Sequence, residues 1–236
     1  MLQQILKELN TKEQRLVLKL NNKLKKVNKE PSYLIDNSIT HAKFNNKDNL
    51  ITIKDENIFE SLVHEQLHAI LLHCNNFPSI SKIRTLSKNY NLHRLDSLIV
   101  DMYNDFHHFV FYKEFNSITN CQNFITNQHQ LLNPKFKFDF LSQKFIGKKY
   151  YHEKVKVFYD SLFIPLNYKI LMNEGNLDWN SESLIKLDNE LFRVLANLFD
   201  LKIEFSLQKN IDCCQDVINS FSIFFENLNK YSLNKQ

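Results

Sequence analysis

Apolar residues recur every three or four positions through residues 2–28, and polar residues fill the intervals between them. This spacing places the apolar side chains on one side of a helix and predicts one or two amphipathic helices. Thr11, followed three residues later by Gln14, forms a candidate capping box within the segment. Pro31 ends it, because proline cannot continue a helix.

Two further helices are indicated in the middle of the chain. The first starts at Asn57, where Glu60 three residues later is a typical helix-start signal, and it runs to about His73. The second begins near Leu92. Its apolar stripe is typical of a helix that faces a core, and consists of Leu95, Leu98, Ile99, Met102, Phe106 and Phe109.

Short strands are expected before the first of these helices. Residues 38–44 and 50–53 flank a turn-prone Asn-Asn-Lys-Asp stretch, which predicts a β-hairpin. Residues 116–148 are polar and weakly periodic. One alternating run in them indicates another short strand, at Phe136, Phe138 and Phe140.

The last third of the chain is predicted to be helical at about 151–163, 182–199 and 211–230, with a strand-like stretch at 202–205. The pattern as a whole predicts a predominantly helical α+β fold. We expect the small hairpin or sheet to pack beside the helix that starts at Asn57.

The expected domain organisation is an N-terminal lobe, residues 1–148, and a helical C-terminal lobe, residues 149–236. No Pro/Ser-rich linker separates the two segments. We therefore expect two lobes of one compact domain.

The glycine content excludes several kinds of chemistry. The chain has only 2 glycines, Gly147 and Gly175, so it contains no Walker phosphate loop, no GxGxxG dinucleotide turn and no GxSxG nucleophile elbow. Tight glycine turns are equally scarce. This composition favours helices joined by loops rich in Asn, Asp and Ser over an all-β fold.

The charge balance gives no reason to expect a nucleic-acid partner. The formal net charge of +4 is spread along the chain, and the densest basic stretch, residues 19–29, is typical of a solvated helix face. No apolar run reaches the roughly 18 residues of a membrane span, and the first residues lack the pattern of a signal peptide. We expect a cytoplasmic protein whose 4 cysteines are reduced, with no membrane association.

One motif carries chemistry: His64-Glu65-Gln66-Leu67-His68, an HExxH sequence within the helix that starts at Asn57. Residues four apart lie on one face of a helix, so His64 and His68 can bind a single metal ion while Glu65 lies beside them. A zinc ion with two imidazoles and one further protein ligand keeps a position open for water and lowers its pKa to about 7. Glu65 can then accept the proton of that water.

This motif, together with the preceding strand and a later acidic helix, resembles the zincin metallopeptidases, a resemblance that covers about residues 38–110. It implies a peptide or protein substrate, a Zn²⁺ cofactor, and a third ligand from a later helix. In the glutamate-type zincins that ligand is Glu, and an acidic residue four positions later orients a zinc-binding histidine. This chain offers Asp101 and Asp105 at the same spacing.

Helical geometry adds a third residue to this set. At 100° per residue, Asp101, Asp105 and His108 fall within about 60° of one another on the helix that begins near Leu92. We expect Asp101 to be the third ligand and Asp105 to fix the tautomer of an imidazole. Either Asp105 or His108 can take the ligand position instead. Asp96 and His107 point to the opposite side.

A hydrolase of this kind also needs a donor for the developing oxyanion. The chain offers several candidates that the sequence does not rank: Tyr103, Tyr112, Tyr150, Tyr151 and His152.

Two other functions remain open. A di-iron carboxylate protein would use the carboxylate-histidine pairs Glu65/His68 and Asp105/His108, with Glu153 or Glu190 from other helices. A non-catalytic helical interaction protein would carry HExxH without using it. The sequence favours a zinc-dependent hydrolase, most readily a metallopeptidase, and leaves its oligomeric state undetermined.

Overall fold

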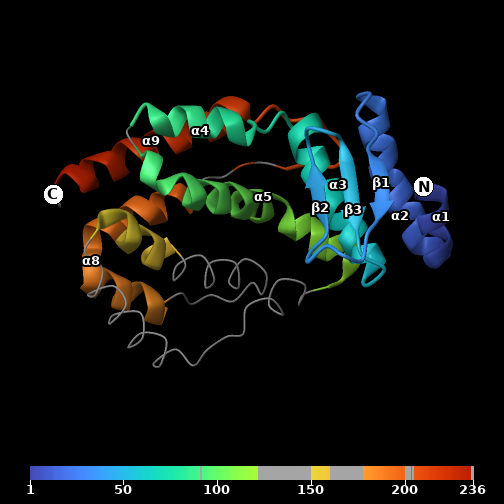
Figure 1. Cartoon of the computed structure of the whole chain (residues 1–236), viewed down its shortest axis with the longest axis horizontal. Coiled ribbons are helices and arrows are strands. Elements are labelled where there is room, and N and C mark those ends of the chain that lie inside the picture. Colours follow the sequence, from blue (N-terminus) through green and yellow to red (C-terminus); the bar gives the residue numbers. More distant parts are fainter. Residues whose placement is uncertain (91, 122–149, 160–177, 200–202, 204, 235–236) are drawn as a thin grey trace. The chain divides into compact units, whose positions relative to one another are not determined.

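The computed structural model describes residues 1–90, 92–121, 150–159, 178–199, 203 and 205–234 (Figure 1). The fold is predominantly helical α+β, as the sequence predicts. The described elements are, in chain order, α1 (Leu2–Ile5), the 3-10 helix η1 (Leu6–Glu8), α2 (Thr11–Lys26), β1 (Ser32–Ile35), β2 (Lys43–Asn45), β3 (Leu50–Ile53), α3 (Ile58–Cys74), α4 (Ile80–Lys88), the 3-10 helix η2 (His93–Leu95), α5 (Asp96–Thr119), α8 (Asp178–Phe199) and α9 (Cys214–Asn234). Residues 151–159 are also helical.

The chain forms two units, each assembled from separate segments. Unit 1 consists of Met1–Phe77, Val110–Cys121 and Glu204–Cys214. Unit 2 consists of Pro78–Phe109, Gln122–Ile203 and Gln215–Gln236. The helix α5 contributes to both, because its residues from Val110 onward belong to unit 1.

A capping box fixes the start of α2 in unit 1, one residue earlier than predicted. The side chain of Asn10 accepts hydrogen bonds from the backbone N–H groups of Lys12 and Glu13, and the Glu13 carboxylate accepts one from the N–H of Asn10. The predicted pair of Thr11 and Gln14 is therefore wrong. Asn10 is as good an N-cap as threonine, and its partner lies three residues later in the same way.

The sheet of unit 1 has the strand order β1-β3-β2. The predicted hairpin is present, since β2 and β3 are antiparallel, but its first strand is limited to residues 43–45. The strand β1 was not predicted from the sequence; it lies parallel to β3, with Tyr33 opposite Ile51. The backbone of β1 forms its hydrogen bonds with a strand distant in sequence, so no adjacent turn in the sequence indicates that β1 is a strand.

The helix α3 carries the HExxH motif and packs against α2, β2 and β3 (Figure 1). Its predicted start at Asn57 and its end near His73 are confirmed. Most of its side chains are buried. The uncharged residues that flank the histidines are fully buried, namely Leu62, Val63, Gln66, Leu67, Ala69 and Ile70.

Asparagine takes the left-handed backbone positions that glycine normally occupies. Among the described residues, every non-glycine residue with a positive φ angle is an asparagine: Asn28, Asn49, Asn57, Asn76 and Asn120. Asparagine tolerates this conformation because its short polar side chain can bond locally. Loops built on asparagine, as the sequence predicts, therefore connect the elements of this chain.

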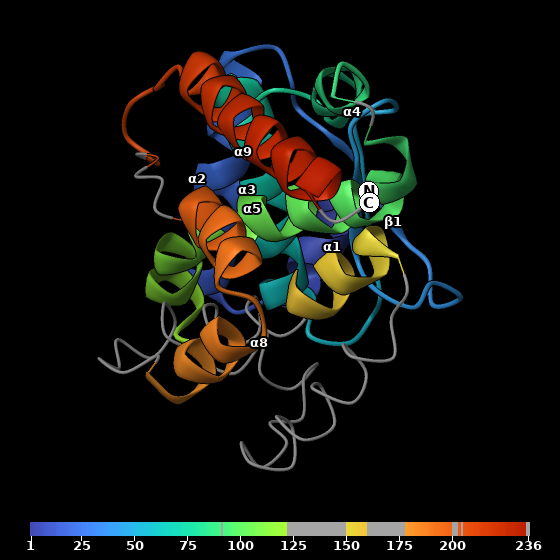
Figure 2. The same cartoon turned by 90° about the vertical axis from the view of Figure 1, so that its left-hand side faces the viewer.

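Unit 2 contains α4, the first part of α5, residues 151–159, α8 and α9. The helix α4 was not predicted from the sequence, although Ile80, Ile83 and Leu86 follow helical spacing. The rings of Phe106 and Phe221 lie 5.5 Å apart and join α5 to α9. Figure 2 shows α9 running next to α8, to which it is tied by a hydrogen bond.

That hydrogen bond marks a kink in α8. Asp188 has non-helical backbone angles inside the helix, and its carboxylate accepts a 2.8 Å hydrogen bond from the hydroxyl of Tyr231 in α9. Burial is the largest cause that raises the pKa of Tyr231, and the neighbouring Asp188 raises it further. The tyrosine therefore stays neutral and donates to the carboxylate.

The structure agrees with the predicted C-terminal helices where it describes them. Helix 151–163 is confirmed over 151–159, and helix 182–199 begins earlier, at Asp178. Helix 211–230 begins later than predicted, at Cys214, and extends to Asn234. In the strand-like stretch 202–205, the two described residues are not in a strand. The predicted strand at Phe136, Phe138 and Phe140 lies outside the described residues.

The cysteines are not paired. Cys74 and Cys213 are buried, Cys121 and Cys214 are partly exposed, and none of the four forms a disulfide. None of the described helices combines the length and the apolar character that a bilayer crossing requires.

Candidate metal centre

The two histidines of the motif lie on one face of α3, as their spacing requires. Their ring centroids are 4.7 Å apart with an interplanar angle of 82°. His68 is 7% exposed, and the side chain of His64 is 12% exposed. Both imidazoles therefore meet along a mostly buried face, where a ligand would be shielded from bulk water.

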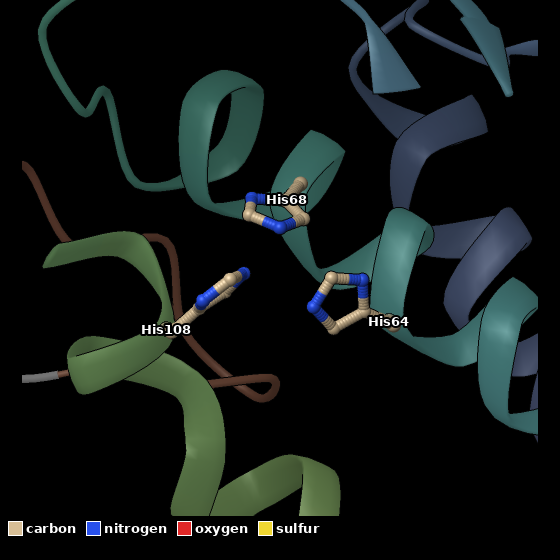
Figure 3. Close-up of side chains that lie close together, drawn as sticks. All are labelled: His64, His68 and His108. Atoms are coloured by element: carbon tan, nitrogen blue, oxygen red, sulfur yellow. The ribbon is translucent and has the colours of Figure 1, made fainter. Parts of the chain in front are cut away.

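A third histidine, His108, completes the group. One ligand atom from each of His64, His68 and His108 lies within 4.8 Å of the others. Figure 3 shows the three imidazoles directed at a common space. His108 is on α5, two residues before the point at which this continuous helix enters unit 1.

Aromatic side chains from the next turns of α5 support this group. The Phe111 ring contacts the imidazoles of His64 and His68 edge to face, with centroid distances of 5.6 Å and 4.9 Å. The Phe115 ring contacts His64 in the same manner at 5.9 Å. Both phenylalanines are fully buried. This apolar wall restricts the motion of the imidazoles and lowers the local dielectric constant, which strengthens electrostatic interactions there.

Glu65 also lies in this region, and it contacts the first histidine directly. Its Oε1 atom is 2.8 Å from Nδ1 of His64, and the residue is 3% exposed. When the Glu65 carboxylate is ionised it can only accept this hydrogen bond, and Nδ1 of His64 then carries the hydrogen. The other ring nitrogen, Nε2, then has the lone pair that a metal ion needs.

The structure does not bring Asp101 into the histidine group. Its side chain is 57% exposed, and the carboxylate lies 3.8 Å from the Lys156 ammonium group. Asp105, the residue expected to fix an imidazole tautomer, accepts a 2.7 Å hydrogen bond from the hydroxyl of Tyr159. Of the three candidates on α5, the structure therefore assembles His108 with the motif.

The two residues expected on the other side of α5 have structural partners. Asp96 forms a 2.7 Å ion pair with Arg84 of α4. His107 is buried, and its ring lies 4.4 Å from that of Tyr103. Burial lowers the pKa of His107 to about 3, so this imidazole is neutral at ordinary pH.

A buried polar network holds the opposite face of α3. Gln66, inside the motif, donates hydrogen bonds from Nε2 to the Tyr33 hydroxyl at 2.9 Å and to the Val17 carbonyl at 3.3 Å. The Tyr33 hydroxyl in turn donates to Asn21 on α2 at 2.7 Å. Burial is the main cause that raises the pKa of Tyr33, which keeps its hydroxyl protonated. The network links α2, β1 and α3 and thereby fixes the rotation of the histidine-bearing helix.

One of the candidate oxyanion donors lies beside the histidines. The Tyr112 ring is 6.4 Å from that of His64, and the residue is 2% exposed. The Tyr103 hydroxyl instead donates to the Pro78 carbonyl at 3.0 Å, and Tyr150 is 51% exposed. Tyr112 is therefore the candidate with a position near the group.

The donor set suits a divalent transition metal. Three imidazole nitrogens are typical ligands of zinc in catalytic sites, where a water molecule occupies the fourth position. Tetrahedral coordination at about 2.0–2.1 Å places ligand nitrogens about 3.3 Å apart. In the structure the ligand atoms lie within 4.8 Å of one another, so rotations about side-chain bonds would be enough to bring them around one ion.

Comparisons with protein-family models, with curated proteins and with solved structures find no match for this chain.

Proposed function

We propose that this protein is a zinc-dependent hydrolase in which His64, His68 and His108 hold the ion. The observation that carries the proposal is the convergence of the three imidazoles, whose ligand atoms lie within 4.8 Å of one another. Two come from a single turn of α3 and the third from α5. Three neutral imidazoles would leave the full charge of a divalent ion uncompensated, and such an ion would lower the pKa of a water molecule bound to it.

Glu65 supplies the general base of the proposed reaction. It belongs to the same helical turn as His64 and lies almost entirely away from solvent. In the proposed reaction the water molecule attacks a carbonyl carbon while its proton passes to the Glu65 carboxylate. The protonated Glu65 then donates this proton to the leaving group.

The resemblance of HExxH to the zincins favours an amide bond, and hence a peptide or protein substrate. The Tyr112 hydroxyl is the proposed donor to the oxyanion, because its ring lies 6.4 Å from that of His64. The di-iron alternative is less well supported. Such a centre needs four carboxylates from four helices, whereas the group in the described residues consists of three histidines.

The test combines metal analysis with a hydrolysis assay on the purified chain. Wild-type protein should bind one zinc ion per chain and cleave a mixed peptide substrate. His64→Ala should lose both properties, whereas His41→Ala should retain them because His41 is exposed and outside the group. Glu65→Gln should keep zinc and lose hydrolysis.

Other results would select a different function. Two iron ions per chain would favour the di-iron protein. The absence of stoichiometric metal from the wild-type chain, after zinc is supplied, would contradict the proposal and favour a non-catalytic interaction protein.

A further inference from the structure

Glu65 occupies an unusual position for a residue that acts only on water. It is 3% exposed, and among the described residues its hydrogen-bond partner is its neighbour His64, at 2.8 Å. A buried carboxylate is costly unless it is paired. The pairing of Glu65 with an imidazole N–H therefore belongs to the architecture of the site.

The hydrogen bond selects one of two orientations of the His64 ring. Rotation by 180° about the Cβ–Cγ bond exchanges Nδ1 with Cδ2 and Nε2 with Cε1. The phenyl rings of Phe111 and Phe115 contact His64 edge to face and have no means of distinguishing nitrogen from carbon. Glu65 makes that distinction, because only Nδ1–H can donate to its carboxylate.

The same hydrogen bond selects the tautomer. With hydrogen on Nδ1, the lone pair of His64 is on Nε2. Figure 3 shows one nitrogen of His64 directed at the space between the three rings and the other directed away from it. Because the nitrogen bonded to Glu65 is Nδ1, the one facing His68 and His108 is Nε2.

We propose that Glu65 is a positioning residue for the metal centre, which holds the His64 ring in the orientation and tautomer that present Nε2 to the ion. This inference rests on the proposed metal site. The position on Nδ1 is the one that Glu65 occupies in the structure, and to act also as base its carboxylate has to leave Nδ1 and turn toward the water molecule on the ion. A carboxylate, histidine and metal ion in series are a recurring arrangement, and loss of the carboxylate typically weakens metal affinity 10-fold to 100-fold. The sequence analysis assigned this role to Asp105.

The test compares two variants of the same length, Glu65→Gln and Glu65→Met. Both remove the charge and the general base, but only glutamine keeps an oxygen that can accept the hydrogen bond from Nδ1. Zinc affinity is measured by competition with a chromophoric chelator, without any hydrolysis assay. Glu65→Gln should bind zinc within a few-fold of wild type, and Glu65→Met should bind it about 10-fold to 100-fold more weakly.

Glu60 provides a matched control on the same helix. It lies in the first turn of α3, outside the histidine group, so Glu60→Gln and Glu60→Met should bind zinc equally well. A second measurement needs no variant. Nitrogen-15 NMR of the metal-free wild-type chain should show His64 with its hydrogen on Nδ1.

The outcomes separate this inference from the proposed function. Equal zinc affinities for Glu65→Gln and Glu65→Met, or a His64 ring with hydrogen on Nε2, would overturn the positioning role and leave the metal site intact. Failure of the wild-type chain to bind zinc would overturn both. If Glu65→Met does not fold, the NMR result on wild type decides the question.

Discussion

Replacement of His108 by alanine should weaken zinc binding far more than replacement of Asp101. His108 places a ligand atom within 4.8 Å of those of His64 and His68. The carboxylate of Asp101 is outside this group and faces the Lys156 ammonium group at 3.8 Å. The two variants therefore distinguish the ligand that the structure assembles from the one that the HExxH resemblance implies.

The expected magnitude follows from the number of ligands. Structural zinc sites with four ligands have apparent binding free energies of about 10–16 kcal/mol, or about 2.5–4 kcal/mol for each ligand. At about 1.4 kcal/mol for each tenfold change, His108→Ala should lower the affinity by about 10²-fold to 10³-fold. Asp101→Ala removes an exposed ion pair, which is typically worth about 0–1 kcal/mol of stability, and should leave zinc affinity unchanged.

The assay is a competition titration of each variant against a chromophoric zinc chelator at constant pH. Circular dichroism of the metal-free proteins verifies that both variants retain the wild-type helix content. The reasoning is refuted if Asp101→Ala binds zinc more weakly by the factor expected for a ligand while His108→Ala binds it as wild type does.

Four further results are expected. Tyr33→Phe removes the hydroxyl that donates to the buried Asn21 side chain and accepts from Gln66, so urea denaturation should show a loss of about 1–3 kcal/mol in unfolding free energy; an unchanged value would mean that the network contributes nothing. Tyr112→Phe should lower the turnover number without changing zinc affinity, and unaltered turnover would exclude its hydroxyl as oxyanion donor. Burial lowers the pKa of His73 below its unfolded value of about 6.5, so its contribution to stability is present above that pH and is lost as the pH falls below it. In denaturation series between about pH 5 and 7.5, His73→Gln should therefore lose less stability on acidification than wild type, and parallel curves would contradict this assignment. A thiol-reactive dye should label the partly exposed Cys121 and Cys214 in the native protein, and should reach the buried Cys74 and Cys213 only on unfolding. Equal labelling of all four in the native protein would contradict the structure.

Several features of the fold could be predicted from the sequence because they depend on local spacing. The four-residue interval between His64 and His68 places both imidazoles on one face of a helix in any tertiary context. The helix around them was predictable from its uncharged flanks and from the start signal at Asn57. The scarcity of glycine, in turn, left asparagine to take the left-handed positions between elements.

Other features depended on partners distant in sequence. The strand β1 has no local signal, because its hydrogen bonds go to β3. The polar network that holds α3 links residues of α2, β1 and α3, with up to 49 positions between them. Their buried hydrogen bonds exist only once these elements have packed together.

The proposed third metal ligand shows the same dependence on partners distant in sequence. The periodicity of α5 puts Asp101 and His108 in one angular sector, but a rise of 1.5 Å per residue separates them by about 10 Å along the helix axis. The sequence alone determined the direction of these side chains and not their height relative to α3. That height depends on tertiary packing: Phe111 and Phe115 contact His64, and it is His108, rather than Asp101, that has a ligand atom within 4.8 Å of those of the motif histidines.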